Sequence, residues 1–275
     1  TADLKLLAIE DSFLELIAIK KILDLSKSTN EYLKFLKKFS DYYPELYKKS
    51  IQIEFTPYIS KSIEEIVNKF GEIKDDASPD LVNIRRSINV VRGKINQSFG
   101  MALSHFNSLG YLDDIKETVV DNRRVLAVQA MYRKKVKGKS YGVSSKGNLT
   151  YVEPEENIII NQNLDKLRIE EHNEIIEILR VVTEQLRIER PNLEAFQRLL
   201  VRFDLFNAKV LFAFSYNGCI PKMTKNTSMY WQNAVHPLLY LKNKSLQLPT
   251  VVQDIELSTD KRLLVISGPN AGGKS

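Results

Sequence analysis

The chain has 275 residues, of which 43% are hydrophobic and 27% are charged, and this balance excludes a wholly disordered or a fibrous protein. No apolar run approaches the roughly 18 residues that a transmembrane helix needs, so we expect no membrane partner. The net charge is +6, and the single cysteine, Cys219, excludes an internal disulfide framework and a cysteine-based zinc site. We therefore expect a reducing compartment, most simply the cytoplasm.

The positive charge is concentrated in one part of the chain. Residues 85–146 contain thirteen Lys and Arg against four Asp and Glu, whereas residues 153–200 contain eleven acidic residues against six basic ones. A surface that binds a phosphate backbone requires such a local excess of basic side chains. The first segment is therefore the candidate nucleic-acid surface, and the second is expected to be a solvated helical region.

The N-terminal part of the sequence is predicted to be helical. Apolar residues recur every three or four positions over residues 3–50, which is the period of a helix with one buried face. We expect a break at residues 26–30 and a boundary at Tyr43-Pro44. A further helix fits residues 60–70, with Gly71 as the residue that follows its C-terminus.

A long helix followed by a small sheet is predicted next. Ser78 before Pro79 is a helix start signal, because serine caps a helix N-terminus and proline suits its first turn. The helical period then continues as far as Phe99. Residues 112–153 change to short runs rich in β-branched residues and glycine, which predicts about four antiparallel strands. Tight turns are expected at residues 137–140 and 144–148.

The C-terminal part returns to helix and then changes again. Residues 155–214 keep a helical period, and Pro191 is the expected kink or junction. Residues 228–275 read as short strands. The last apolar run, residues 263–266, leads into a glycine-rich loop, as a buried strand of a nucleotide-binding sheet does.

That loop satisfies the phosphate-loop pattern G-x-x-x-x-G-K-S. Its glycines let backbone N–H groups point at phosphates, Lys274 supplies a cation, and the Ser275 hydroxyl is suited to bind Mg²⁺. We therefore expect ATP and Mg²⁺ as cofactors. The predicted ATP-binding residues of the loop are Gly268, Pro269, Asn270, Ala271, Gly272, Gly273, Lys274 and Ser275.

We expect the sequence to be part of a larger protein, because it has no initiator methionine and no helix follows its phosphate loop. That helix would direct its dipole at the phosphates, and a later acidic strand would hold the metal. These 275 residues alone are therefore expected not to hydrolyse ATP, and the segment contains no catalytic residue that we can assign.

Several stretches of the sequence resemble the MutS family of DNA-repair ATPases. Leu264–Ser275, with Gly-Pro-Asn before the loop glycines, is similar to the family's phosphate loop, and Ala234–Leu239 is similar to the start of its ATPase domain. Asp76–Arg86 resembles the start of the long helix in the family's second branch, which lacks the mismatch-recognition domain and often ends in a small nuclease domain. Tyr151–Pro154 resembles that branch's Phe-Ile-Glu-Pro stretch.

The resemblance implies a mainly α fold. It consists of a helical core with two long lever helices, a small antiparallel β clamp inserted at their tips, and the first strands of a truncated P-loop α/β ATPase domain. The implied divisions are 1–80 (core, first part), 81–111 (lever helix), 112–153 (β clamp), 154–227 (returning lever helix and core) and 228–275 (start of the ATPase domain).

The resemblance also implies partners and site residues. The family closes around DNA as a homodimer driven by ATP, and its second branch is associated with suppressing homologous recombination in bacteria, so the compartment would be the cytosol or nucleoid. Val251 and Val252 match positions that line the adenine pocket. The predicted DNA-binding residues, all in or near the clamp, are Arg123, Arg124, Arg133, Lys134, Lys135, Lys137, Lys139 and Lys146.

Two other functions remain open from the sequence. The basic tip could face rRNA in a ribosome-associated ATPase of the same family, or the chain could belong to an unrelated P-loop NTPase with a helical regulatory region. The basic residues could also have no binding role. The clamp lysines could only keep an edge strand soluble, and Arg85, Arg86, Arg92 and Lys94 could form a solvated helix face. We expect His236 to make a structural hydrogen bond.

Overall fold

The computed structural model describes residues 2–267 of the chain, with side chains from residue 4. These residues form two compact units, which adjoin in sequence at Gln197 and Arg198. The predicted mainly α fold with a small antiparallel sheet is confirmed. No helix among the described residues is both long enough and apolar enough to span a membrane.

The first unit begins with a bundle of helices around an apolar core. Its members are α1 (Ala2–Leu6), α2 (Leu16–Lys38), α3 (Pro44–Ser50) and α4 (Pro57–Ile66). Ile19 and Ile63 are completely buried between α2 and α4, and they share one hydrophobic cluster with Leu186 and Phe196 from later helices. The predicted boundary at Tyr43-Pro44 is confirmed, because α3 begins at Pro44.

Two predictions in this bundle are wrong. Helix α2 runs through residues 26–30 without a break, because Ser26, Thr29 and Asn30 are buried and find hydrogen-bond partners. The Thr29 hydroxyl donates to the Leu25 carbonyl, and the Asn30 side chain pairs with the Ser26 hydroxyl and with the backbone of Thr56. Helix α4 ends at Ile66, before the expected residue 70. Gly71 instead lies at φ +80° in a turn closed by a bridge between residues 67 and 73.

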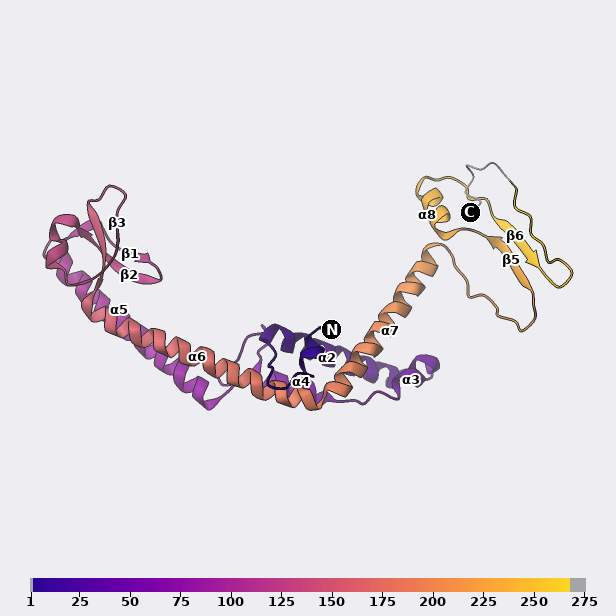
Figure 1. The fold of residues 1–275 in the computed structure, drawn as a ribbon, viewed down its shortest axis with the longest axis horizontal. Coiled ribbons are helices and arrows are strands. Elements are labelled where there is room, and N and C mark those ends of the chain that lie inside the picture. Colours follow the sequence, from indigo (N-terminus) through magenta and orange to yellow (C-terminus); the bar gives the residue numbers. More distant parts are fainter. Residues whose placement is uncertain (1, 268–275) are drawn as a thin grey trace. The chain divides into compact units, whose positions relative to one another are not determined.

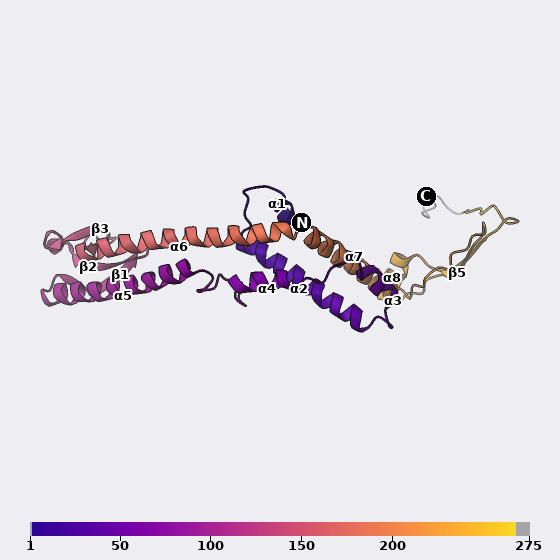
Figure 2. The same cartoon turned by 90° about the horizontal axis from the view of Figure 1, so that it is seen from below.

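Two long helices dominate the unit. They are α5 (Pro79–Ser108) and α6 (Glu155–Ile188), and they lie side by side and antiparallel (Figures 1 and 2). The predicted cap is confirmed: the Ser78 hydroxyl accepts a hydrogen bond from the Leu81 N–H at 3.0 Å. The same hydroxyl donates to Glu174 of α6 at 2.6 Å, so the start of α5 is fixed to its neighbour. At 1.5 Å per residue, α5 is about 45 Å long.

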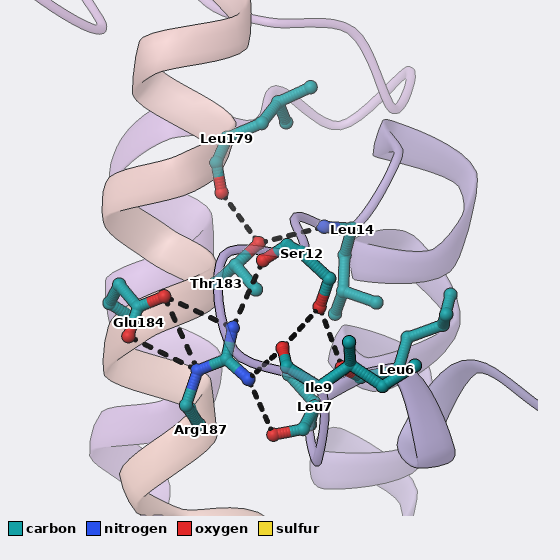
Figure 3. Close-up of polar contacts among 9 residues, drawn as sticks. All are labelled: Leu6, Leu7, Ile9, Ser12, Leu14, Leu179, Thr183, Glu184 and Arg187. Carbon is teal, nitrogen blue, oxygen red and sulfur yellow. Dashed lines mark hydrogen bonds and ion pairs between the residues drawn. The ribbon is translucent and has the colours of Figure 1, made fainter.

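Polar contacts attach the C-terminal end of α6 to the segment before α2 (Figure 3). The Arg187 guanidinium donates to the backbone carbonyls of Leu7, Ile9 and Ser12 at 2.6–3.0 Å. One turn earlier, the buried Thr183 hydroxyl accepts from the Leu14 N–H at 2.9 Å. Residues 7–15 form no helix or strand, and these contacts satisfy three carbonyls and one N–H group of this loop. We call this end of α6 the root.

The other end of α6 carries a four-stranded antiparallel sheet, which we call the β module (residues 112–154; Figure 1). Its strands are β1 (Leu112–Val120), β2 (Arg123–Gln129), β3 (Gly138–Val143) and β4 (Leu149–Pro154), in the order β1-β2-β4-β3, with a 3₁₀ helix η1 (Ala130–Lys135) between β2 and β3. Leu126, Val128 and Val152 bury their side chains against Phe99 of α5.

The turns of the β module differ in part from prediction. The turn at residues 144–148 is confirmed, whereas residues 138–140 belong to β3, so the turn expected at 137–140 is wrong. The β1–β2 connection is a two-residue turn at Asp121 and Asn122, which the prediction lacked. Both residues have positive φ, 48° and 59°, the geometry that two-residue hairpins need and that Asp and Asn tolerate.

Helix α7 (Arg190–Ser215) runs across the boundary between the units, and the predicted junction at Pro191 is confirmed by its place in the first turn of this helix. The second unit also contains β5 (Met229–Ala234), α8 (Pro237–Ser245) and β6 (Gln253–Leu257), with β5 and β6 antiparallel. Residues 263–266 form no strand, and their side chains are 53–90% exposed. A strand needs a hydrogen-bonded neighbour, and no described strand pairs with this segment.

Candidate nucleic-acid interface

Five of the six lysines of the β module follow one another along the chain, from η1 through the edge strand β3 to the turn after it; the sixth, Lys116, lies on β1 at the opposite edge of the sheet. Lys134 and Lys135 end η1, Lys137 and Lys139 lie at the start of the edge strand β3, and Lys146 lies in the turn after β3; all five are exposed. We call these five residues the basic edge. Lys134, Lys137 and Lys146 form no ion pair with any other described residue, so their charges are available to a partner.

Local structure fixes the path of the chain along this edge. The Arg133 guanidinium donates to the carbonyls of Val136 at 2.8 Å and Gly138 at 3.0 Å, which closes the turn between η1 and β3. Gly138 has φ +148°, and a Cβ atom at this position would overlap the Glu153 carbonyl oxygen. Glycine is therefore required for β3 to lie so close to β4.

Aromatic rings support two of the lysines. The Lys135 ammonium lies 5.4 Å and 5.5 Å from the ring centroids of Tyr111 and Tyr132, which stack on each other at 4.6 Å. Lys139 lies 5.0 Å from the ring of Tyr141. All three tyrosines are half-buried, so their rings are packed against the module as well as facing the lysines.

The structure places the three predicted DNA-binding arginines differently from the lysines. Arg133 is used in the turn described above. Arg123 forms an ion pair with Asp165 of α6. Arg124 binds Glu117 at 2.6 Å and Asn96 of α5 at 3.1 Å, and its guanidinium carbon lies 4.3 Å from the centroid of the Phe99 ring. The sequence grouped eight basic residues together, and the structure separates five exposed lysines from three internally bound arginines.

A buried carboxylate in the module was not singled out from the sequence. Glu153 of β4 is 2% exposed, and it accepts hydrogen bonds from the Tyr141 hydroxyl at 2.8 Å and from the Asn161 amide of α6. Burial, together with the Glu153 carboxylate, raises the pKa of Tyr141. The available signal was an acidic residue within an otherwise apolar strand.

The basic residues of α5 lie beside a hollow of about 1390 Å³, which Arg85, Arg86 and Arg92 line together with acidic side chains. Arg85 itself pairs with Asp75 and with Glu171 of α6, and therefore joins segments of this unit. Arg86, Arg92 and Lys94 are exposed. The mixed charge of this hollow makes it a poorer phosphate-binding surface than the basic edge.

The remaining candidate residues come from residues 236–275 of the chain. His236 caps α8, where its Nδ1 accepts a hydrogen bond from the Leu239 N–H at 3.4 Å, so the expected structural role is confirmed. Val251 and Val252 are 84% and 49% exposed and precede β6. The predicted phosphate-loop residues 268–275 lie outside the described residues. Within the described part, no group of three or more His, Cys, Asp or Glu side chains could hold a metal ion.

No family profile matches the chain. It is, however, 31% identical over 264 residues to "Endonuclease MutS2" of Ligilactobacillus salivarius, an alignment that covers 95% of this chain and 32% of the relative. It is also 30% identical over 261 residues to the protein of the same name in Streptococcus suis, and 32% identical over 265 residues to the one in Streptococcus equi subsp. equi; these alignments cover 95% and 96% of the chain and 32% of each relative.

These similarities extend over almost the whole described chain, through both the helical and the strand regions. The chain belongs to the MutS family. Within that family it is of the MutS2 type, and it spans about a third of the length of the curated relatives it matches. The relationship overturns the alternative of an unrelated P-loop NTPase.

Proposed function

We propose that this chain is the part of a MutS2-type protein that grips nucleic acid and joins that grip to an ATPase. The observation that supports the proposal is the basic edge: five exposed lysines in and around the edge strand β3 of a small sheet, carried at the end of two helices of 30 and 34 residues. Flexible ammonium groups on a sheet edge bind phosphates without reading bases. The preferred ligand is therefore duplex or branched DNA of any sequence.

In the whole protein we propose that ATP binds the phosphate loop. Lys274 would contact the phosphates, and Ser275 would hold Mg²⁺. Both cations would stabilise the negative charge that develops on the transferred phosphoryl group. Val251 and Val252 would contact the adenine. A homodimer would close around DNA, and the biological outcome would be suppression of homologous recombination. These 275 residues alone would bind DNA without hydrolysing ATP.

The direct test is a titration of the chain against fluorescent duplex and four-way-junction DNA at several salt concentrations. A variant with Lys134, Lys135, Lys137 and Lys139 changed to Ala is compared with a matched control, in which the exposed lysines Lys37, Lys38, Lys49 and Lys61 of the helical bundle are changed to Ala. Each lost phosphate contact lowers the slope of log K against log salt by about 0.9. We expect the first variant to lose a slope of about 3 to 4 and the control to keep the wild-type slope.

Equal losses in the two variants would contradict a grip by the basic edge, because they would show that only net charge matters. The same edge would also suit rRNA, since it contacts phosphates rather than bases. Competition between purified ribosomes and DNA distinguishes these partners. If ribosomes displace labelled DNA when they are less abundant than that DNA, the main ligand is rRNA and not DNA.

A further inference from the structure

Three polar residues of α6 form a ladder beneath the β module. Asn157, Asn161 and Asp165 are four residues apart, so they share one face of the helix. Each contacts a different element. The Asn157 amide donates to the Ile95 carbonyl of α5 at 3.2 Å, Asn161 donates to the buried Glu153 of β4, and Asp165 pairs with Arg123 of β2.

The module is also held on its other side. Arg123 and Arg124 are neighbours at the start of β2, and successive side chains of a strand point to opposite faces. Arg123 accordingly binds α6, and Arg124 binds α5, where its guanidinium covers the fully buried ring of Phe99. Two adjacent residues therefore fix the sheet to both long helices.

The exposure of these side chains separates them from the basic edge. The Arg123 side chain is 18% exposed and that of Arg124 is 35% exposed, and both guanidinium groups contact carboxylates. A guanidinium that a carboxylate already neutralises releases few counterions when a phosphate approaches. Arginine is suited to this task, since its planar fork binds carboxylates and stacks on aromatic rings.

We infer that Arg123 and Arg124 are positioning residues, which hold the basic edge in a fixed orientation on α5 and α6 and do not themselves contact phosphates. The inference assigns a role to residues that the sequence placed in the binding surface. The tests of this inference that measure DNA binding rest on the proposed function. It also means that a displacement of α6 would move the whole module with the helix.

The test exchanges the charges of one ion pair. Arg123→Asp and Asp165→Arg are made singly and together, and the double variant has the net charge of the wild type. For a positioning pair, Arg123→Asp weakens DNA binding by roughly tenfold, and the double variant recovers most of that loss. For a phosphate contact, the double variant stays as weak as Arg123→Asp, since the positive charge then lies on α6.

Removal of the charge without reversal gives a second readout. In Arg123→Gln and Arg124→Gln we expect the slope of log K against log salt to stay within experimental error of wild type, whereas Lys137→Ala lowers it by about 0.9. A fall of about one unit in either arginine variant would overturn the inference. Thermal unfolding of each variant, and recovery of binding in Arg123→Lys, exclude global loss of the fold as the cause.

A third readout does not need nucleic acid. Spin labels are attached to cysteines at Lys146 of the module and Gln162 of α6, in a Cys219→Ser background, because Cys219 is exposed and would react. We expect the distance distribution to broaden in Arg123→Gln and to stay narrow in Lys137→Ala. A narrow distribution in Arg123→Gln would overturn the inference even if DNA bound, and broadening would support it even if the DNA proposal failed.

Discussion

The two ends of α6 are held by different kinds of interaction. At the root, Leu179 and Leu186 are buried in the large apolar cluster of the helical bundle, Thr183 is a buried polar residue, and Arg187 adds hydrogen bonds to backbone carbonyls. At the N-terminal end of α6 with the β module, which we call the tip, a small apolar cluster around Phe99 is supplemented by ion pairs and amide contacts. The root is therefore held mainly by apolar burial, which is expected to contribute most to stability, whereas polar contacts that fix orientation have a larger share at the tip.

The largest effect on stability is expected from a cavity in the apolar cluster that surrounds the root. Phe196 is completely buried in that core, and we expect Phe196→Ala to lower the free energy of unfolding by about 3–5 kcal/mol. The measurement is urea unfolding followed by circular dichroism. Ile188→Ala is the control, because Ile188 is 78% exposed, and it should change stability by less than about 0.5 kcal/mol. Similar losses in both variants would contradict the assignment of the core.

An intermediate effect is expected at the tip. Gly138→Ala forces a Cβ against the Glu153 carbonyl at φ +148°, and we expect a loss of about 1–3 kcal/mol that affects the β module most. Hydrogen exchange of β3 and β4 measures it. The matched control is Gly93→Ala in α5, where no atom lies near the new methyl group and alanine favours helix, so a gain of up to about 1 kcal/mol is expected. Faster exchange throughout α2 and α4 would contradict the separation of tip from root.

The smallest effect concerns a pH dependence at the root. A hydrogen bond to Glu189 raises the pKa of Tyr58 to about 12. The folded pKa lies above the ordinary value, so this contribution to stability is complete below pH 10 and is lost as the pH rises towards 12. The difference in tyrosinate absorbance between wild type and Tyr58→Phe reports this group, and Glu189→Gln should return its titration towards pH 10. A normal titration in the wild type would contradict the hydrogen bond.

The features that sequence reasoning predicted correctly are those with local causes. The Ser78-Pro79 start of α5 and the junction at Pro191 depend on residues next to each other, and hydrophobic period marked the long helices. The failures involve distant partners. Ser26, Thr29 and Asn30 look like a helix break until Thr56 is placed beside Asn30. Residues 263–266 look like a strand, but no described strand pairs with them.

In the candidate site, too, sequence reasoning succeeded where the cause is local and failed where a distant partner decides. Charge counting located the basic segment, because lysines on a short edge strand remain exposed in almost any packing. It could not separate Arg123 and Arg124 from Lys137 and Lys139, since all four are basic residues in one module. Their partners, Asp165 and Asn96, lie 42 and 28 residues away in the chain.

The sequence by itself determined the helices, the existence of a small basic sheet between two of them, and the phosphate-loop motif, because periodicity, capping and charge are properties of neighbouring residues. Only the tertiary structure decided which basic residues are available to a ligand. Burial of Glu153 and pairing of Arg123 with α6 arise when segments far apart in sequence meet, and desolvation and ion pairing depend on that meeting rather than on residue type.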